Sequence, residues 1–241
     1  MTQVTAGASR PAVSVHLLVL PGLDGLGKGL TRFATALHSR MSVEIVRYPA
    51  HEPLGYAELE ARVRAQLPPQ PFVLLAESFS GPLAIRIAAD PPPELRALVL
   101  ASSFARFPLP CPRWARPLAA RFPVKSLPRW LRALLLAGSL DPRAAPAAAE
   151  RSMAGVDAAV IRHRIAQLLE VDERRRLPSI AVPVLILSAR GDRVLSRRAA
   201  RSLAVGCPQA QRLELAGPHA LLQRRPEPCA EAVLQFAQRW I

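Results

Sequence analysis

Apolar segments of strand length alternate along most of the chain with segments whose apolar residues recur at helical spacing. The strand-length segments occupy 13–20, 43–48, 72–76, 95–101, 182–188 and 211–215. Continuous apolar runs between turn residues are typical of strands buried on both faces of a parallel sheet. The alternation predicts an α/β fold with a doubly wound, mostly parallel sheet, in which ligands bind at the carboxyl ends of the strands.

Helical patterns follow these strands, and one long segment departs from the alternation. Helices are expected at 30–37, 56–67, 79–89, 196–205 and 228–241. From 104 to 178 the chain carries several prolines and helical patterns at 130–136 and 160–169, but no strand pattern. We therefore predict a core made of 1–103 and 179–241, with 104–178 inserted as a helical cap over the strand ends.

The sharpest predicted turn lies between the apolar run at 72–76 and the helix that follows it. Ser78 stands at this corner, with the small residues Ala76 and Ser80 two positions to either side. Such a turn favours a strained backbone at its central residue and small neighbours around it. The Ser78 hydroxyl is expected above the sheet, near the positive N-terminal end of the next helix.

Two more reactive side chains follow later strands, Asp192 after 182–188 and His219 after 211–215. Each of the three residues also has a simpler interpretation: Ser78 as a helix cap, Asp192 as a turn residue and His219 as the start of a helix. A serine hydroxyl becomes a good nucleophile when a histidine takes its proton and a carboxylate orients the imidazole. Their order and their places after strands predict a catalytic Ser-Asp-His set.

At these residues the chain resembles the α/β-hydrolase superfamily, along nearly its whole length. PGLDGLG at 21–27 resembles the loop after the family's first strand, where His-Gly is more usual, and AESFS at 76–80 resembles the nucleophile elbow. The segment 187–196 is similar to the acid loop, and GPH at 217–219 to the histidine loop. A narrower resemblance to esterases and acyltransferases, including plant phytyl ester synthases, covers mainly the first hundred residues.

The resemblance implies a role for each site residue. Ser78 is the expected nucleophile, His219 the group that transfers its proton, and Asp192 the carboxylate that orients His219. The backbone N–H groups of Leu23 and Phe79 are expected to form the oxyanion hole, so their side chains matter less than their backbone positions.

Three features of the sequence bear on this assignment. Ala76 and Ser80 stand where the family usually carries glycines, which adds crowding at a strained turn. Ser102 and Ser103 follow the strand at 95–101, so the acid position used by some relatives holds no carboxylate and Asp192 is preferred. Glu77, beside the nucleophile, either tunes the site or is simply a polar residue at a variable position.

The resulting prediction is a serine hydrolase that cleaves a carboxylic ester or thioester through an acyl-enzyme on Ser78. An acyltransferase with the same three residues, or a catalytically silent binding protein on this fold, remains the alternative. Apolar cap residues fit an acyl or aromatic pocket and equally fit helices that pack on the core. These residues are Leu109, Trp114, Leu118, Phe122, Trp130, Leu131, Leu134 and Leu135.

The chain has 32 basic and 18 acidic residues, a net charge of +14, and nearly all of the basic residues are arginines. Such a bias arises from genome composition, or it attracts anionic substrates, a membrane surface or nucleic acid. The basic residues of the cap suggest an anionic carrier such as coenzyme A or phosphopantetheine. Basic runs interleaved with aromatic residues are lacking, so no nucleic-acid partner is expected. The partner is expected to be a small acyl ester or thioester, and the sequence leaves the oligomeric state open.

Cysteines and glycines indicate no bound cofactor. Cys111, Cys207 and Cys229 are widely spaced, which argues against a disulfide framework and a zinc site. The glycines at 21–27 match neither common nucleotide-binding motif. No cofactor or metal is therefore expected. No apolar run is long enough to span a bilayer, and the first residues carry no secretion signal, so we expect a cytoplasmic protein.

Overall fold

A computed structural model of the protein describes residues 16–108, 153–195 and 197–241. Six parallel strands form one sheet in the order β2-β1-β3-β4-β5-β6. The strands are β1 (His16–Leu20), β2 (Ser42–Ile45), β3 (Phe72–Glu77), β4 (Leu95–Ala101), β5 (Val184–Ala189) and β6 (Gln211–Leu215). All six strand predictions are therefore confirmed within the described residues, and β2 ends earlier than expected.

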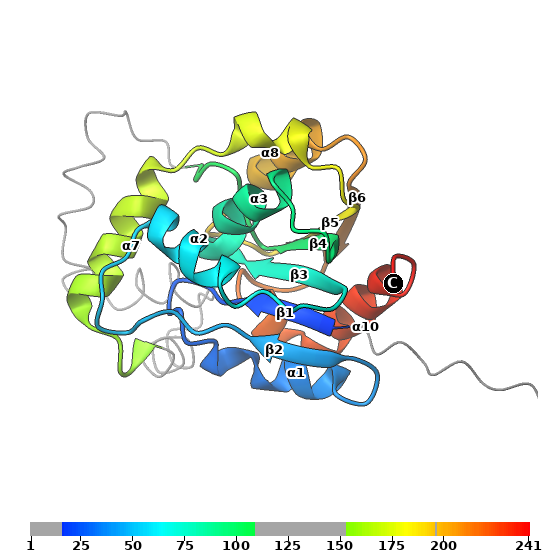
Figure 1. Cartoon of the computed structure of the whole chain (residues 1–241), viewed down its shortest axis with the longest axis horizontal. Coiled ribbons are helices and arrows are strands. Elements are labelled where there is room, and N and C mark those ends of the chain that lie inside the picture. Colours follow the sequence, from blue (N-terminus) through cyan, green and yellow to red (C-terminus); the bar gives the residue numbers. More distant parts are fainter. Residues whose placement is uncertain (1–15, 109–152, 196) are drawn as a thin grey trace, which may run out of the picture.

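Helices cover both faces of this sheet (Figure 1). One buried cluster joins the sheet to α2, α3 and α8, and a second cluster joins its other face to α1, α9 and α10. The helices are α1 (Thr31–Leu37), α2 (Tyr56–Arg64), α3 (Gly81–Ala89), α7 (Ala158–Glu170), α8 (Arg197–Gly206), α9 (Leu221–Arg224) and α10 (Pro226–Ala237). Short 3-10 turns add η1 (Lys28–Leu30), η2 (Ser78–Ser80) and η5 (Arg174–Ser179). The predicted doubly wound α/β fold is confirmed.

The packing of the central strand β3 explains why its sequence is apolar at nearly every position. Phe72, Leu74 and Ala76 pack into the cluster that includes α3, while Val73 and Leu75 point to the cluster that includes α10. Side chains alternate between the two faces of a strand, so a strand with helices on both sides must be apolar throughout. Edge strand β6, in contrast, is mostly exposed.

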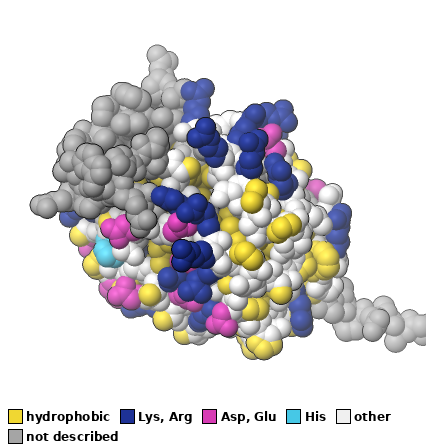
Figure 2. All heavy atoms as spheres, turned by 90° about the horizontal axis from the view of Figure 1, so that it is seen from above, with side chains coloured by type: hydrophobic (Ala, Val, Ile, Leu, Met, Phe, Trp, Pro, Cys, Tyr) yellow, Lys and Arg dark blue, Asp and Glu magenta, His cyan; other side chains and the backbone are white. Residues whose placement is uncertain are grey.

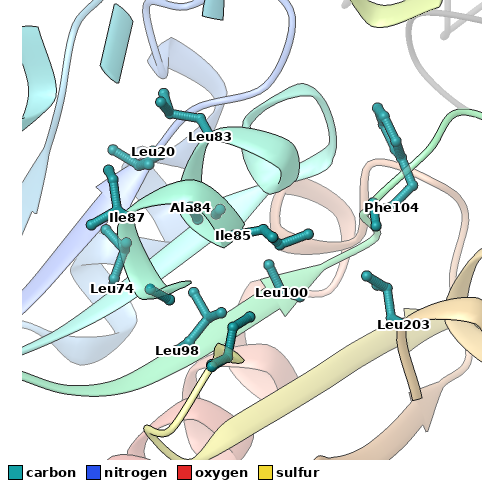
Figure 3. Packing of buried hydrophobic residues seen from close by; sticks show 14 of the residues in the cluster. Leu20, Leu74, Leu83, Ala84, Ile85, Ile87, Leu98, Leu100, Phe104 and Leu203 are labelled. Atoms are coloured by element: carbon teal, nitrogen blue, oxygen red, sulfur yellow. The ribbon is translucent and has the colours of Figure 1, made fainter. Parts of the chain in front are cut away.

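Helix α3, which follows the serine corner in the chain, packs its apolar side chains on the sheet (Figure 3). Leu83, Ala84, Ile85 and Ile87 are fully buried there, near Leu74 of β3 and near Leu98 and Leu100 of β4. Burying one such Leu or Ile side chain contributes about 1.5–3 kcal/mol to folding. This packing fixes both the strand before Ser78 and the helix after it.

The predicted cap at 104–178 is described only in part. The helix expected at 160–169 is present as α7, and an antiparallel bridge pairs Arg106 with Asp172. The helix expected at 130–136 and the apolar cap residues lie outside the described residues. In the part of the chain that the structure describes, no helix has the length and apolar character needed to cross a membrane.

Candidate active site

Every predicted site residue lies in a segment that follows the carboxyl end of a strand. The loop with Leu23 follows β1, and Ser78 and Phe79 follow β3. Asp192 follows β5, and His219 follows β6. Because the strands are parallel, these ends share one edge of the sheet, which is where ligands bind in open α/β folds.

The backbone of Ser78 has the strained conformation that the sequence predicts, with φ of 47°. This left-handed conformation is costly for a residue with a Cβ and persists only where the surroundings impose it. The Ser78 carbonyl accepts hydrogen bonds from the Ser103 hydroxyl, at 2.8 Å, and from the Gly81 N–H. Gly81 must lack a side chain, since a Cβ there would lie 1.7 Å from Ser103 Oγ.

Three side chains form one continuous line of hydrogen bonds. Ser78 Oγ lies 2.8 Å from His219 Nε2, and His219 Nδ1 lies 2.8 Å from Asp192 Oδ2. A carboxylate at Nδ1 favours the tautomer with the proton on Nδ1, which leaves Nε2 free to accept the serine proton. The His219 residue is 7% exposed, so these bonds are largely shielded from water.

The acid and histidine loops are fixed to each other by their backbones. Asp192 Oδ1 accepts the N–H groups of Val194 and Leu195, each at 2.8 Å. The Gly191 N–H donates to the Gly217 carbonyl at 2.9 Å, and a Cβ on Gly191 would lie 2.9 Å from that oxygen. These contacts hold the carboxylate in place and leave its second oxygen for His219.

The two backbone N–H groups predicted as oxyanion donors have no hydrogen-bond acceptor in the part of the fold that the structure describes. Among the described residues no backbone or side-chain acceptor takes the Leu23 N–H, which lies in a turn closed by Gly25 N–H to Gly22 carbonyl at 3.0 Å. Phe79 lies in the first turn of a helical segment, where N–H groups have no partner one turn earlier. Both N–H groups are therefore available to a ligand.

Ser80 does more than fit a crowded turn. Its hydroxyl donates to the Pro21 carbonyl in the loop after β1, and it lies 2.7 Å from the hydroxyl of Tyr48. Tyr48 is fully enclosed, and burial raises the pKa of its phenol well above the usual range. The sequence did not reveal this contact, because nothing near Ser80 in the chain indicates that Tyr48 reaches it.

Glu77 is buried, with 5% of its surface exposed, so it is not a solvated surface residue. Its Oε1 accepts a hydrogen bond from the Gln223 side chain of α9 at 2.7 Å. Burial raises the pKa of the Glu77 carboxyl to about 7, against the opposing effects of Gln223 and the Gly22 N–H. This hydrogen bond thus joins Glu77, the residue before Ser78, to α9, the helix after His219.

Metal and thiol chemistry find no support in the described residues. No group of three or more His, Cys, Asp or Glu side chains in 16–108, 153–195 and 197–241 is placed to hold a metal ion. Burial raises the pKa of the Cys207 thiol to about 11 and that of Cys229 to about 12. Neither cysteine is therefore a reactive thiolate near neutral pH.

Comparison with known proteins gives a family match. The model of a family described as "Alpha/beta hydrolase family" matches residues 2–232. A search of curated proteins returned no significant match.

Solved structures match over most of the chain. An enol-lactonase from Burkholderia xenovorans LB400 has a TM-score of 0.75 and 18% identity, covering 93% of this chain and 92% of its own. A bromoperoxidase from Bacillus anthracis has a TM-score of 0.78 and 16% identity, and an esterase from Exiguobacterium antarcticum has 0.76 and 14%; each match covers 93% of this chain and 92% of the other. At these identities the likeness shows a shared fold.

Proposed function

We propose that this chain, which belongs to the alpha/beta hydrolase family, is a serine hydrolase that cleaves a carboxylic ester or thioester. The observation that carries the proposal is the hydrogen-bonded line from Ser78 Oγ through His219 to Asp192. The names of an enol-lactonase and an esterase among the structurally similar proteins agree with a substrate that has an ester carbonyl.

In the first half of the reaction, His219 Nε2 takes the proton of Ser78 as Oγ attacks the acyl carbonyl carbon. The carbonyl oxygen becomes an oxyanion, and Asp192 stabilises the positive imidazolium. The bond to the leaving oxygen or sulfur then breaks, His219 returns the proton to that atom, and the acyl group stays on Ser78.

In the second half, water takes the place of the leaving group. His219 removes a proton from water, whose oxygen attacks the acyl-enzyme carbonyl. Collapse of the second tetrahedral intermediate breaks the bond to Ser78 Oγ, which regains the proton from His219. The products are a free acid and the alcohol or thiol released in the first half.

The oxyanion of both intermediates is assigned to the Leu23 and Phe79 N–H groups. The residues lie in loops after neighbouring strands, and the Leu23 N–H has no acceptor among the described residues. A preorganised donor of this kind contributes about 3 kcal/mol to transition-state stabilisation. Its effect is large because it costs no reorganisation during the reaction.

The test combines a fluorophosphonate probe with p-nitrophenyl esters of increasing chain length. The parent should be labelled and active, while Ser78→Ala should show neither labelling nor esterase turnover. Ser42→Ala is the matched control, since Ser42 is exposed at the amino end of β2, the opposite edge of the sheet. Labelling of Ser78→Ala equal to that of the parent would refute the assignment of the nucleophile.

Asp192→Asn tests the carboxylate separately. Asp192 Oδ1 already accepts two backbone N–H groups, so the amide NH2 of the asparagine would face His219 and donate to Nδ1. This bond requires the tautomer with the proton on Nε2, which cannot take the serine proton, so kcat should fall by roughly 10³-fold or more while the protein stays folded. Turnover is measured with the ester that the parent cleaves best, and folding by circular dichroism. Undiminished kcat would point to another acid.

A further inference from the structure

Helix α7 carries one arginine on its buried side. Arg164 is 1% exposed, and it occupies an apolar position of the helix, four residues after the buried Val160 and four before the buried Leu168. A charged side chain at such a position is stable only if its donors are satisfied. The exposed Arg162 of the same helix shows the ordinary alternative.

The Arg164 guanidinium binds the backbone of the loop after β1. Its Nη1 donates to the carbonyl oxygens of Leu23, at 3.0 Å, and Asp24, at 2.8 Å. Its Nη2 donates to the Pro49 carbonyl at 2.9 Å, and its Cζ lies 5.6 Å from the centre of the Tyr48 ring. No acidic side chain within 16–108, 153–195 and 197–241 forms an ion pair with it, so carbonyl oxygens and an aromatic face hold the buried charge.

The loop is shaped to receive this side chain. Gly25 has φ of 68°, and a Cβ there would lie 2.5 Å from Arg164 Nη1. Burial lowers the pKa of Arg164, whereas Tyr48 and the Asp24 carboxyl favour its charged form. A planar guanidinium can direct several N–H groups at fixed angles, which a lysine ammonium cannot.

The bound carbonyls belong to the two peptide planes that follow the Leu23 N–H in this turn. That N–H shares a peptide plane with the Gly22 carbonyl, which accepts from Gly25 N–H to close the turn. The two peptide planes inside the turn carry the Leu23 and Asp24 carbonyls, and Arg164 holds both. Without it, these planes can rotate, the turn loosens, and the Leu23 N–H loses its fixed direction.

We propose that Arg164 is a positioning residue that holds the Leu23–Asp24 turn so that the Leu23 N–H is preorganised for the oxyanion. This inference rests on the proposed function. It assigns to α7, 141 residues away in the chain, a part in assembling the site. Because the oxyanion exists only in the tetrahedral states, loss of Arg164 should reduce kcat and leave KM nearly unchanged.

The experiment compares Arg164→Lys and Arg164→Gln with Arg162→Gln, the exposed control on the same helix. For each folded variant, kcat and KM are measured with the best p-nitrophenyl ester, together with Ki for an arylboronic acid that forms a tetrahedral adduct. Both Arg164 variants should lose about 10²-fold in kcat, and the boronic acid should bind more weakly in proportion. Arg162→Gln should match the parent.

A second line of evidence uses chemical rescue and a second variant. Ethylguanidine at sub-denaturing concentration should restore part of kcat in Arg164→Ala and leave the parent unchanged. If the Arg164 variants do not fold, Gly25→Ala displaces the guanidinium without removing it, and folded Gly25→Ala should show the same selective loss of kcat.

Two outcomes overturn the inference: kcat of folded Arg164→Lys and Gly25→Ala within twofold of the parent, or a loss that appears in KM instead of kcat. These outcomes are distinct from failure of the proposed function. If the parent itself shows neither fluorophosphonate labelling nor turnover, the hydrolase proposal fails and the positioning role fails with it. If the parent is labelled and active and the Arg164 variants match it, only the positioning role is refuted.

Discussion

At the scale of single residues, Ser80 shows how a side chain can have two reasons for its identity. It is small enough for a tight turn, and its hydroxyl is the hydrogen-bond partner of buried Tyr48 and of the Pro21 carbonyl. Glycine or alanine would meet the first requirement alone. The expected crowding at Ser80 is therefore accompanied by a favourable contact between the elbow and the loop after β1.

Ser80→Ala should accordingly destabilise the protein, although it removes a single oxygen. The Tyr48 hydroxyl would be left buried without this partner, and such a group costs about 1–3 kcal/mol. Urea unfolding measures the change in the free energy of unfolding. Tyr48→Phe combined with Ser80→Ala should cost less than the sum of the two single variants, and strict additivity would contradict the coupling.

The Glu77 carboxyl makes stability depend on pH. Burial, and then the Asp24 charge, raise its pKa from 4.5 to about 7, whereas the Gln223 and Gly22 hydrogen bonds and His219 lower it. Between these two values the folded protein keeps a proton that the unfolded chain has lost. The contribution of Glu77 is thus fully present below pH 4.5 and is lost as pH rises through about 7, a change of roughly 3 kcal/mol.

Glu77→Gln removes this titration, so the variant should gain stability relative to the parent as pH rises through the same window. The measurement is urea unfolding of both proteins at several pH values, with the difference in unfolding free energy plotted against pH. Arg162→Gln serves as a control for general surface effects. A difference that does not change with pH would show that the carboxyl is already ionised in the folded protein below neutral pH.

At the scale of elements, the junction of η2, α3 and the end of β4 allows no added atom. Gly81 begins α3, and a Cβ there would meet Ser103 Oγ at 1.7 Å, Ser103 Cβ at 2.9 Å and the Phe104 carbonyl at 3.1 Å. Gly81→Ala should therefore push the start of α3 away from β4 and cost about 1–3 kcal/mol. Because Ser78 precedes this helix, kcat should fall as well.

Ser103→Ala provides the test of this explanation. It removes the oxygen that the new Cβ would strike, at the expense of the hydrogen bond to the Ser78 carbonyl. Urea unfolding of Gly81→Ala, Ser103→Ala and the double variant should show a double variant less destabilised than the sum of the singles. Additive losses would mean that the clash lies with Ser103 Cβ or the Phe104 carbonyl instead.

Helix α7 shows how much of a buried contact can be inferred from the residue spacing of a helix. An arginine at the buried spacing of Val160 and Leu168 predicts a charged group inside the fold. The pattern does not tell which acceptors the group meets, because Leu23, Asp24 and Pro49 are more than a hundred residues away. The contact depends on how the fold places α7 beside the loop after β1.

At the scale of the whole molecule, the net charge of +14 is the dominant electrostatic feature. Basic side chains are spread over the face seen in Figure 2, with acidic side chains interspersed among them. A field of this sign raises the encounter rate of anionic substrates, and salt screens it. If the charge has a function beyond composition, we expect it in the rate at which anionic substrates are captured.

The corresponding prediction contrasts two substrates with the same acyl group. For a coenzyme A thioester, kcat/KM should fall roughly tenfold between about 0.01 M and about 1 M salt, because the Debye length shrinks from about 30 Å to about 3 Å. For the neutral p-nitrophenyl ester, kcat/KM should change little. Equal salt dependence of the two substrates would argue that the charge has no part in capture.

The sequence by itself determined the strands, most of the helices and the loops that carry Ser78, Asp192 and His219. These features depend on neighbours in the chain: a strand covered on both faces must be apolar, and a strained corner requires small residues. The family assignment and the α/β fold are confirmed. The catalytic roles of the three residues, the oxyanion donors Leu23 and Phe79, and the cap stay predictions.

Only the tertiary structure decided the strand order and the partners of buried polar groups. The contacts of Ser80 with Tyr48, of Glu77 with Gln223 and of Arg164 with the Leu23 carbonyl join residues 32, 146 and 141 positions apart. No local pattern encodes such pairs, because each buried donor takes whichever acceptor the packed fold brings within reach. For Glu77 the sequence left even its burial open, and the fold decided both its burial and its partner.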